Sequence, residues 1–488
     1  MPGVDDLEKP GVIDTDYLVI GAGASGMAFT DALIQESDAE VVMVDRQHRP
    51  GGHWNHAYPF VRLHQPSASY GVNSRALGTE SIDTTGPNAG FYERATAVEI
   101  CDYYRGVLED HLLPSGKVRF LGGCDYVENG SNGHAITSRL TGKTTTVRVR
   151  RKVVDGTYLA SSVPATHTPG FTVASDAQLI PVGDLVAVSE PPSGYTILGA
   201  GKTAMDACNW LLDNGVDPDR IRWIKPRDAW LWDRASLQPL DLIVSTMERL
   251  SHGIEALAEA EDVDDFFRRF EACGLLFRLD PTVEPTMFRG AIVSRAEGES
   301  LRQIERIVRL GRVVHLGADR IELEDGAIPT DRGEIHVDCT AYGFRAAPAR
   351  PIFEPGRITV QTLSGGFTAF NAALVGFVES VRDDDAEKNR LCPPVSQPSQ
   401  PIDLVPGVCG FLRYFATHSA EPDLMAWSAG SRLALTRGLT EHMEDPRMQS
   451  AMARWIANLE PAVENEEQLL AGSASSNPLS AAADRQRA

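Results

Sequence analysis

The sequence predicts an α/β protein with two similar nucleotide-binding domains, a helical insertion in the second domain and a C-terminal helical segment. Two segments, which begin near residues 16 and 194, each follow the order strand, glycine turn, helix and strand. A chain of 488 residues exceeds one ordinary hydrophobic core, which favours two or three domains. A proline-rich stretch at 391–407 precedes the C-terminal segment.

The first unit is DYLVIGAGASGMAFTDALIQESDAEVVMVDR, residues 16–46. Gly21 permits a tight turn, Gly23 lets the backbone approach a pyrophosphate at the helix N-terminus, and Gly26 lets the helix pack closely on the strand. Asp45 ends the next strand and can accept hydrogen bonds from a ribose without a 2′-phosphate. The unit therefore predicts an FAD site of the Rossmann type. Its predicted binding residues are Gly21, Gly23, Ala24, Ser25, Gly26, Asp45 and Arg46.

The second unit is SGYTILGAGKTAMDACNWLLDNGVDPDRIRWIKPRDAW, residues 193–230. Its turn has the pattern GxGxxA, and its second strand is followed by Lys225 and Arg227 rather than by an acid. Cationic side chains at this point suit a 2′-phosphate, although solvated surface charges are the alternative interpretation. We therefore predict NADPH at this Rossmann-like unit. The predicted binding residues are Gly199, Gly201, Lys202, Thr203, Ala204, Lys225 and Arg227.

The stretch RPGGHWNHAYPFVRLHQPSASYG, residues 49–71, follows the first unit and suits the flavin end of such a cofactor. Gly51 and Gly52 let the backbone pass close to a ligand, and Trp54 or Tyr58 can cover an isoalloxazine edge. Its three histidines stand without nearby cysteine or carboxylate partners. No metal site is therefore predicted.

The same stretch resembles the GGxW, YP and RLHxP pattern that follows the FAD motif in flavin-containing monooxygenases and their Baeyer–Villiger relatives, the class B flavoprotein monooxygenases. VVDGTY and VDCTAYGF are similar to the ATG motifs of these enzymes, and the likeness in architecture extends over residues 14–390. The resemblance implies that Gly52, His53, Trp54, Leu63 and His64 lie along the FAD.

The resemblance also implies an activity. NADPH would reduce FAD, oxygen would add to form a C4a-peroxyflavin, and one oxygen atom would pass to a nitrogen, sulfur or carbon of a small-molecule substrate. No catalytic acid or base is identified, because the flavin carries the chemistry. The relatives have FxGxxxH before the second glycine motif, whereas this chain has no histidine there, so the Baeyer–Villiger reaction is not specifically indicated.

Two alternatives stay open from the sequence. The first is a reductase or dehydrogenase of a small molecule, since the absence of CxxC argues only against the disulfide-reductase branch. The second is a non-catalytic sensor that retains its nucleotides. A flavin-dependent halogenase is disfavoured, because WLWDRASLQP does not match the WxWxIP pattern of those enzymes.

The predicted domain organisation follows the motifs. An FAD domain comprises residues 14–160 and 331–395, and an NADPH domain comprises 161–330 with a helical insertion at about 235–300. The insertion is either core packing or a lid. The C-terminal segment, 396–470, can cap the pocket or mediate dimer contacts, and 471–488 is expected to be disordered.

One further cofactor contact is predicted late in the FAD domain. Gly365 and Gly366 precede an expected helix whose N-terminus suits the negative charge of a reduced flavin's pyrimidine side. A plain strand-to-helix connection is the alternative interpretation.

Composition limits the partners. The 46 Lys+Arg against 67 Asp+Glu give a formal charge of -21, which disfavours nucleic acids and anionic lipid surfaces. The seven cysteines form no CxxC pair, and no signal peptide or membrane span is evident. The prediction is a cytoplasmic enzyme with a small-molecule substrate and molecular oxygen as partners. Assembly into a homo-oligomer is left open.

Overall fold

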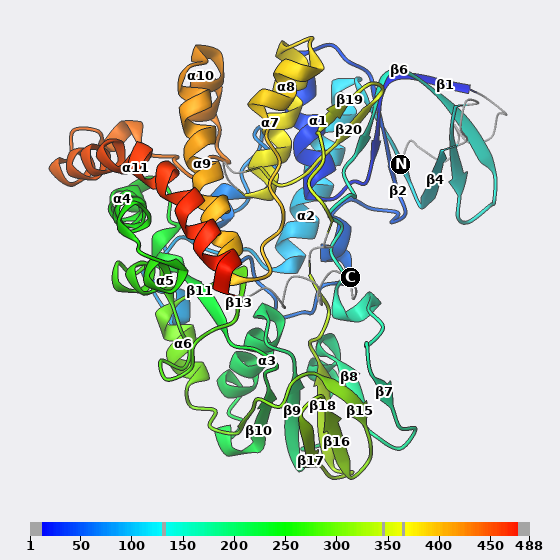
Figure 1. The fold of residues 1–488 in the computed structure, drawn as a ribbon. Helices are drawn as coiled ribbons and strands as arrows, with labels where there is room; N and C mark the ends of the chain where they lie inside the picture. The colour runs from blue at the N-terminus through cyan, green and yellow to red at the C-terminus, as the bar shows by residue number, and fades with distance from the viewer. Residues whose placement is uncertain (1–11, 129–132, 344–346, 364–366, 477–488) are drawn as a thin grey trace.

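The computed structural model describes residues 12–128, 133–343, 347–363 and 367–476, and the strands of these residues form four sheets (Figure 1). The first glycine motif lies at the carboxyl ends of the parallel strands of one large sheet, and the second lies at the same end of another sheet. Each sheet places its motif where a parallel strand ends and a helix begins. This is the arrangement in which open α/β sheets bind ligands.

The first sheet has the order β19-β20-β6-β1-β2-β3, with β4 and β5 attached through β6. Strands β1, β2, β3 and β6 are parallel and rich in buried β-branched residues. Its strands are β1 (Val12–Ile20), β2 (Val41–Asp45), β3 (Val118–Gly122), β4 (Cys124–Glu128), β5 (His134–Ser138), β6 (Thr144–Asp155), β19 (Phe353–Glu354) and β20 (Arg357–Thr359). The associated helices are α1 (Ala24–Glu36), α2 (Ala97–Val107), α7 (Thr368–Val381) and α8 (Asp385–Leu391).

The second sheet is parallel throughout, with the order β14-β10-β9-β18-β8. Its strands are β8 (Leu179–Pro181), β9 (Gly194–Leu198), β10 (Ile221–Ile224), β14 (Ile307–Val308) and β18 (Glu334–Asp338), and helix α3 (Lys202–Asp213) follows β9. Because β18 pairs with β8 and β9, residues 334–338 belong to this sheet. The predicted boundary at residue 331 therefore falls too early, and we place the return to the first domain after Asp338.

The predicted helical insertion contains strands as well as helices. Helices α4 (Ile243–Glu259), α5 (Val263–Ala272) and α6 (Arg295–Leu301) accompany the strands β12 (Leu276–Phe277) and β13 (Met287–Val293). Both strands pair with β11 (Ala229–Asp233), which lies just before the insertion. A fourth sheet joins β7 (Thr172–Val173), β15 (Val313–Leu316), β16 (Arg320–Leu323) and β17 (Gly326–Pro329).

The C-terminal segment forms α9 (Leu404–Ser419), α10 (Pro422–Gly430) and α11 (Pro446–Ser476). In Figure 1, α11 lies beside α4, and buried residues of α4, α5, α9 and α11 share one apolar cluster. The insertion and the C-terminal segment therefore share a core. Helix α11 continues to Ser476, so residues 471–476 are helical rather than part of a disordered tail, and 477–488 lie outside the described residues.

A short stretch between α10 and α11, residues 431–438, connects distant parts of the chain. Arg437 and Arg432 form ion pairs with Glu80, at 2.6 and 3.0 Å, and the Leu240 amide donates to the Arg437 carbonyl at 2.7 Å. Glu80 and Leu240 are the two non-glycine residues at positive φ in the described chain, with φ of 58° and 55°. A conformation this rarely adopted persists only where surrounding contacts hold it.

Candidate active site

A single cavity of about 1370 Å³ runs past both glycine motifs. It is lined by the ends of β1, β2, β9 and β18, by the starts of α1 and α3, and by the stretch 52–65. The predicted site residues that line it are Gly21, Gly23, Ala24, Ser25, Asp45, Arg46, Gly52, His53, Trp54, Leu63, His64, Gly199, Gly201, Lys202, Thr203 and Arg227. The fold thus brings residues of both units to one connected space.

The first glycine turn is crowded on one side and open on the other. Gly21 has φ +94°, and a Cβ on Gly26 would lie 1.9 Å from the Gly21 carbonyl oxygen, so Gly26 packs against the turn without lining the cavity. A Cβ on Gly23 would instead lie 3.5 Å from Gly52 Cα, on the cavity side. No side chain caps α1, whose N-cap is Gly23, so its first amides are available to a ligand.

Asp45 holds the turn from the end of β2. One carboxylate oxygen accepts from the Ala22 amide at 2.6 Å and the other accepts from the Gln47 amide at 2.7 Å. Burial raises the pKa of this carboxyl group. Each oxygen retains acceptor capacity for a ribose hydroxyl. Arg46 is mostly exposed and pairs with Asp125 at 3.0 Å.

The second glycine turn repeats the first. Gly199 has φ +128°, and its Cβ would lie 2.6 Å from the Cys339 carbonyl oxygen, whereas a Cβ on Gly201 would meet nothing within 4 Å. Gly201 is the N-cap of α3 and adds no side-chain cap. Ala204 is fully buried beneath the turn and does not line the cavity.

The two ATG-like segments support the two turns in the same way. Asp155, at the end of β6, accepts from the amide and hydroxyl of Thr157 at 2.9 and 2.8 Å. Asp338, at the end of β18, accepts from the amide and hydroxyl of Thr340 at 2.9 and 2.6 Å. The likeness between the two motifs is therefore also a structural equivalence.

Lys225, which the sequence predicts to bind NADPH, does not line the cavity. Its side chain is buried, forms an ion pair with Asp228 and lies 4.8 Å from the centre of the Trp223 ring, away from the cavity. The ion pair joins the first and last residues of the sequence KPRD. Their i,i+3 spacing could have indicated from the sequence that Asp228 neutralises Lys225.

Two arginines that the sequence did not single out join Arg227 at the cavity wall. Arg289, on β13, and Arg312, just before β15, line the same cavity. Desolvation, followed by the positive charges of Arg227 and Arg312, lowers the pKa of Arg289. Within the described chain, no carboxylate forms an ion pair with any of the three guanidinium groups. Three cations so placed favour an anionic ligand group.

The stretch after β2 forms a short 3-10 turn, Gly52–His56, against the first glycine motif. Trp54 donates its indole N–H to the Tyr70 hydroxyl at 2.7 Å. His53 and His64 both line the cavity, and neither imidazole is hydrogen bonded to another described residue. Burial lowers the pKa of His53 to about 4. It also lowers that of His64 to about 3, with help from the charges of Lys202, Arg234 and Arg94.

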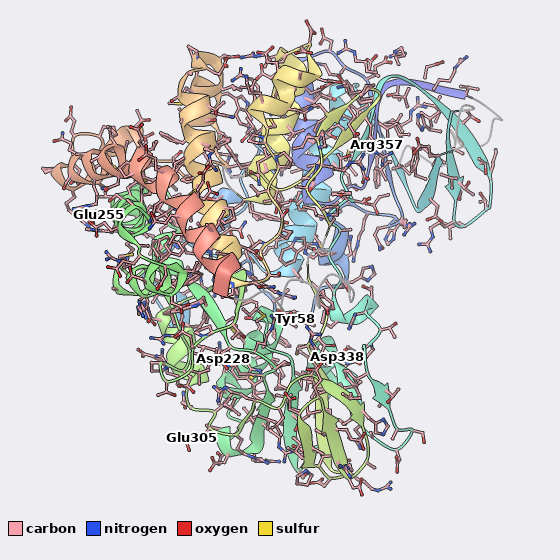
Figure 2. All side chains as sticks on the ribbon, viewed as in Figure 1. Tyr58, Asp228, Glu255, Glu305, Asp338 and Arg357 are labelled. Carbon is pink, nitrogen blue, oxygen red and sulfur yellow. The ribbon has the colours of Figure 1, made fainter. Side chains whose placement is uncertain are left out.

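Tyr58, in the same stretch, links the two domains. The Tyr58 hydroxyl donates to Asp206 of α3 at 2.6 Å, and Figure 2 labels Tyr58 between the two large sheets. The same carboxylate pairs with Lys202 of the second glycine motif. Burial and the Asp206 charge raise the pKa of Tyr58 well above its ordinary value. The charge of Lys202 is therefore already compensated within the protein.

Other predicted contributions are absent or lie outside the described residues. Gly365 and Gly366 are outside them, although Phe367 and Thr368 at the start of α7 line the cavity. Helices α4 and α5 and the described C-terminal segment supply no lining residue, and the insertion lines the cavity through β13. The described residues include no group of His, Cys, Asp and Glu able to hold a metal, and none of their helices is long and apolar enough to cross a membrane.

We expect His53 to make the apo protein less stable to acid. Its folded pKa of about 4 lies below the unfolded value of 6.5, so the unfolded chain takes up the proton first. The contribution of neutral His53 to the free energy of unfolding is therefore fully present above pH 6.5. It is lost as the pH falls toward 4, by up to about 1.4 kcal/mol per pH unit. Urea unfolding at several pH values should show a shallower fall for His53→Gln than for wild type. His252→Gln, at an exposed site on α4, should leave the pH profile unchanged; equal profiles for all three proteins would refute the assignment.

Comparison with known proteins adds three findings. The family model described as NAD(P)-binding Rossmann-like domain matches residues 19–73. Uncharacterized protein Rv2000 of Mycobacterium tuberculosis is 45% identical over 434 residues, covering 88% of this chain and 79% of the relative, and Uncharacterized protein Mb2023 of Mycobacterium bovis gives the same values. Polycyclic ketone monooxygenase of the fungus Thermothelomyces thermophila superposes with a TM-score of 0.50 at 13% identity, covering 92% of this chain and 89% of that one. The last likeness shows a shared fold.

Proposed function

This chain belongs to the family of the mycobacterial proteins Rv2000 and Mb2023, and we propose that it is an FAD-dependent, NADPH-using oxidoreductase that acts as a monooxygenase on a small molecule. The observation that carries the proposal is the presence of two equivalent glycine turns that open into one cavity. Two nucleotide sites that share a space allow a hydride to pass from a nicotinamide to a flavin. The fold shared with a ketone monooxygenase supports this assignment.

The residues at the first turn fit FAD. Gly23 and Gly52 line the cavity with bare backbone that a pyrophosphate can approach closely, the uncapped start of α1 offers amides to it, and Asp45 offers acceptors to the ribose. When bound, FAD would accept a hydride and transfer electrons to molecular oxygen. The cavity-facing His53, Trp54 and His64 would lie along it, as the family resemblance implies.

The protein's own part in such a reaction is positional. The neutral imidazoles of His53 and His64 offer N–H donors to the cavity without adding charge. The Tyr58–Asp206 hydrogen bond holds the flavin-side stretch to α3 and so fixes the distance between the two sites. The indole of Trp54 and the side chain of Leu63 would present apolar surface to the cavity and so help to exclude water from the reaction.

The arginines at the second site favour NADPH over NADH. We expect Arg227→Ala to weaken NADPH binding about tenfold and to leave NADH binding nearly unchanged, because a charge-assisted contact to the 2′-phosphate is lost. Lys225→Met should instead lower the melting temperature without changing the preference, because Lys225 contacts Asp228 and Trp223. Titration of both variants with both nucleotides checks this. An equal loss of NADPH and NADH in Arg227→Ala would refute the role of this residue.

The proposal is tested on protein reconstituted with FAD. Anaerobic NADPH should bleach the flavin absorption. When ¹⁸O₂ is then admitted with a panel of amines, sulfides and ketones, oxygen should be consumed and a product should form that carries one ¹⁸O atom. Turnover only with an added acceptor such as a quinone would instead establish a reductase. Retention of NADPH without oxidation would establish a sensor. Failure to bind FAD would refute the proposal.

A further inference from the structure

We propose that Arg94, Arg234 and Glu297 form a positioning cluster that fixes the backbone of Leu63 and His64 against the second domain, residues 161–338. This inference rests on the proposed function, since it concerns the alignment of the flavin-side stretch with the nicotinamide site. None of the three residues lines the cavity.

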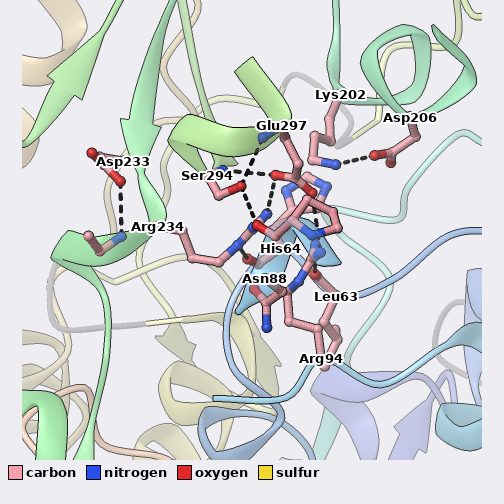
Figure 3. A network of polar contacts seen from close by, with 12 residues as sticks. Leu63, His64, Asn88, Arg94, Lys202, Asp206, Asp233, Arg234, Ser294 and Glu297 are labelled. Carbon is pink, nitrogen blue, oxygen red and sulfur yellow. Dashed lines mark hydrogen bonds and ion pairs between the residues drawn. The ribbon is translucent and has the colours of Figure 1, made fainter. Parts of the chain in front are cut away.

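Two arginines each hold one of two consecutive carbonyl groups (Figure 3). Arg94 donates to the Leu63 carbonyl at 3.2 Å, and Arg234 donates to the His64 carbonyl at 3.3 Å. Glu297 joins the arginines: one of its oxygens lies 3.2 Å from Arg94 Nη2 and the other lies 2.7 Å from Arg234 Nη2. The backbone that carries the His64 ring is therefore restrained at two adjacent peptide groups.

The cluster is assembled from three separate parts of the chain. Arg94 precedes α2 in the first domain, Arg234 follows β11, and Glu297 lies in the first turn of α6. Glu297 also accepts from the Ser294 amide at 2.8 Å, in a capping box that fixes the carboxylate at the helix start. Their side chains are at most 7% exposed. The contacts of the cluster thus cross between the first and the second domain.

The cluster carries one more positive charge than an ion pair between the two domains would need. Two guanidinium groups face one carboxylate, which leaves a net positive charge behind His64. Although burial opposes its ionisation, the charges of Lys202, Arg234 and Arg94 lower the pKa of Glu297 to about 2. A neutral Arg–Glu pair would suffice to hold the domains together at lower cost. The additional cation instead secures the second carbonyl and disfavours protonation of the neighbouring imidazole.

Such a restraint matters because hydride transfer is sensitive to small displacements. A misplacement of about 1 Å between reacting groups can cost about 100-fold in rate. The Leu63–His64 stretch belongs to the cavity wall on the flavin side, while Glu297 belongs to the second domain. Loosening the cluster should therefore lower the rate of flavin reduction more than the affinity for either cofactor.

Arg94→Met tests the proposal without leaving an unpaired buried charge, because Arg234 and Glu297 remain as a neutral pair. In stopped-flow reduction of the FAD-loaded protein by NADPH, the limiting rate should fall at least about tenfold, while the dissociation constant of NADPH stays within about twofold. Arg94→Lys, which keeps the charge, should recover part of the rate. Arg269→Met, at a more exposed ion pair with Glu259, is the control and should match wild type.

A second readout does not depend on the cofactors. In the apo protein, hydrogen exchange of the amides in residues 60–70 should accelerate in Arg94→Met and stay unchanged in Arg269→Met, with α7 unaffected in both. Unchanged exchange in residues 60–70, or a loss of rate that arises wholly from weaker NADPH binding, would overturn the proposal. Failure of the wild-type protein to bind FAD would refute the proposed function instead, and the exchange result would still decide whether the cluster restrains Leu63–His64.

Discussion

Replacing Gly26 by valine is expected to prevent the first domain from folding. A Cβ at this position would lie 1.9 Å from the Gly21 carbonyl oxygen and 3.1 Å from its carbon, both of which are backbone atoms that cannot rotate away. Separating α1 from the turn would break its packing against β1 and α7. Steric conflicts of this kind cost more than about 4 kcal/mol, which is a large share of the stability of a typical domain.

Soluble yield, circular dichroism and the melting temperature measure this outcome. Gly407→Val is the matched control, because Gly407 also lies in a helix, α9, but a Cβ there would meet nothing within 4 Å. We expect the control to keep the wild-type melting transition. A Gly26→Val protein that melted as a folded domain would show that the approach of α1 to the turn is not needed.

The neighbouring variant Gly23→Ala should give the opposite combination, a folded protein that does not retain FAD. Its Cβ would lie 3.5 Å from Gly52 Cα, an ordinary contact, so the apo structure tolerates it. Because Gly23 lines the cavity at the start of α1, the methyl group would crowd the backbone surface that a pyrophosphate must approach. We expect about 100-fold weaker FAD binding, equivalent to about 3 kcal/mol of overpacking.

The measurement is the flavin content of purified protein, followed by titration of the apo form with FAD. Gly201→Ala provides the comparison, because its Cβ enters open space at the second turn and should reduce NADPH affinity while FAD is retained. Full FAD occupancy in Gly23→Ala would remove the pyrophosphate assignment. Loss of both cofactors in Gly201→Ala would indicate that the two sites are not separable.

The two glycine units were predictable because their requirements are local. A turn that must pass a phosphate, a helix that must start beside it and a buried strand on either side all fall within about thirty residues, which is the span of one βαβ unit. Gly21, Gly199 and Asp45 lie where that reasoning put them. The boundary at residue 331 was wrong because VDCTAYGF and VVDGTY look alike, and the sequence does not state which sheet each strand joins.

The charged groups were less predictable because their roles depend on contacts between segments distant in sequence. Arg227, Arg289 and Arg312 approach one another only because β10, β13 and β15 bring three segments to one wall. Arg94, Arg234 and Glu297 likewise meet through the packing of α6 and β11 on the first domain. Lys225 illustrates the converse, because it forms an ion pair with Asp228, three residues further along the chain, and does not line the cavity.

The contacts made by residues 431–438 can form only late in the synthesis of the chain. Glu80 and Leu240 hold their left-handed backbone conformations against contacts from Arg437, yet both leave the ribosome long before that arginine does. Domains generally begin to fold as they are synthesised, from the N-terminal side. The segments around Glu80 and Leu240 therefore lack these contacts until Arg437 has left the ribosome. A nascent chain arrested before residue 431 would lack these contacts, and protease should cleave it in the loops around both residues.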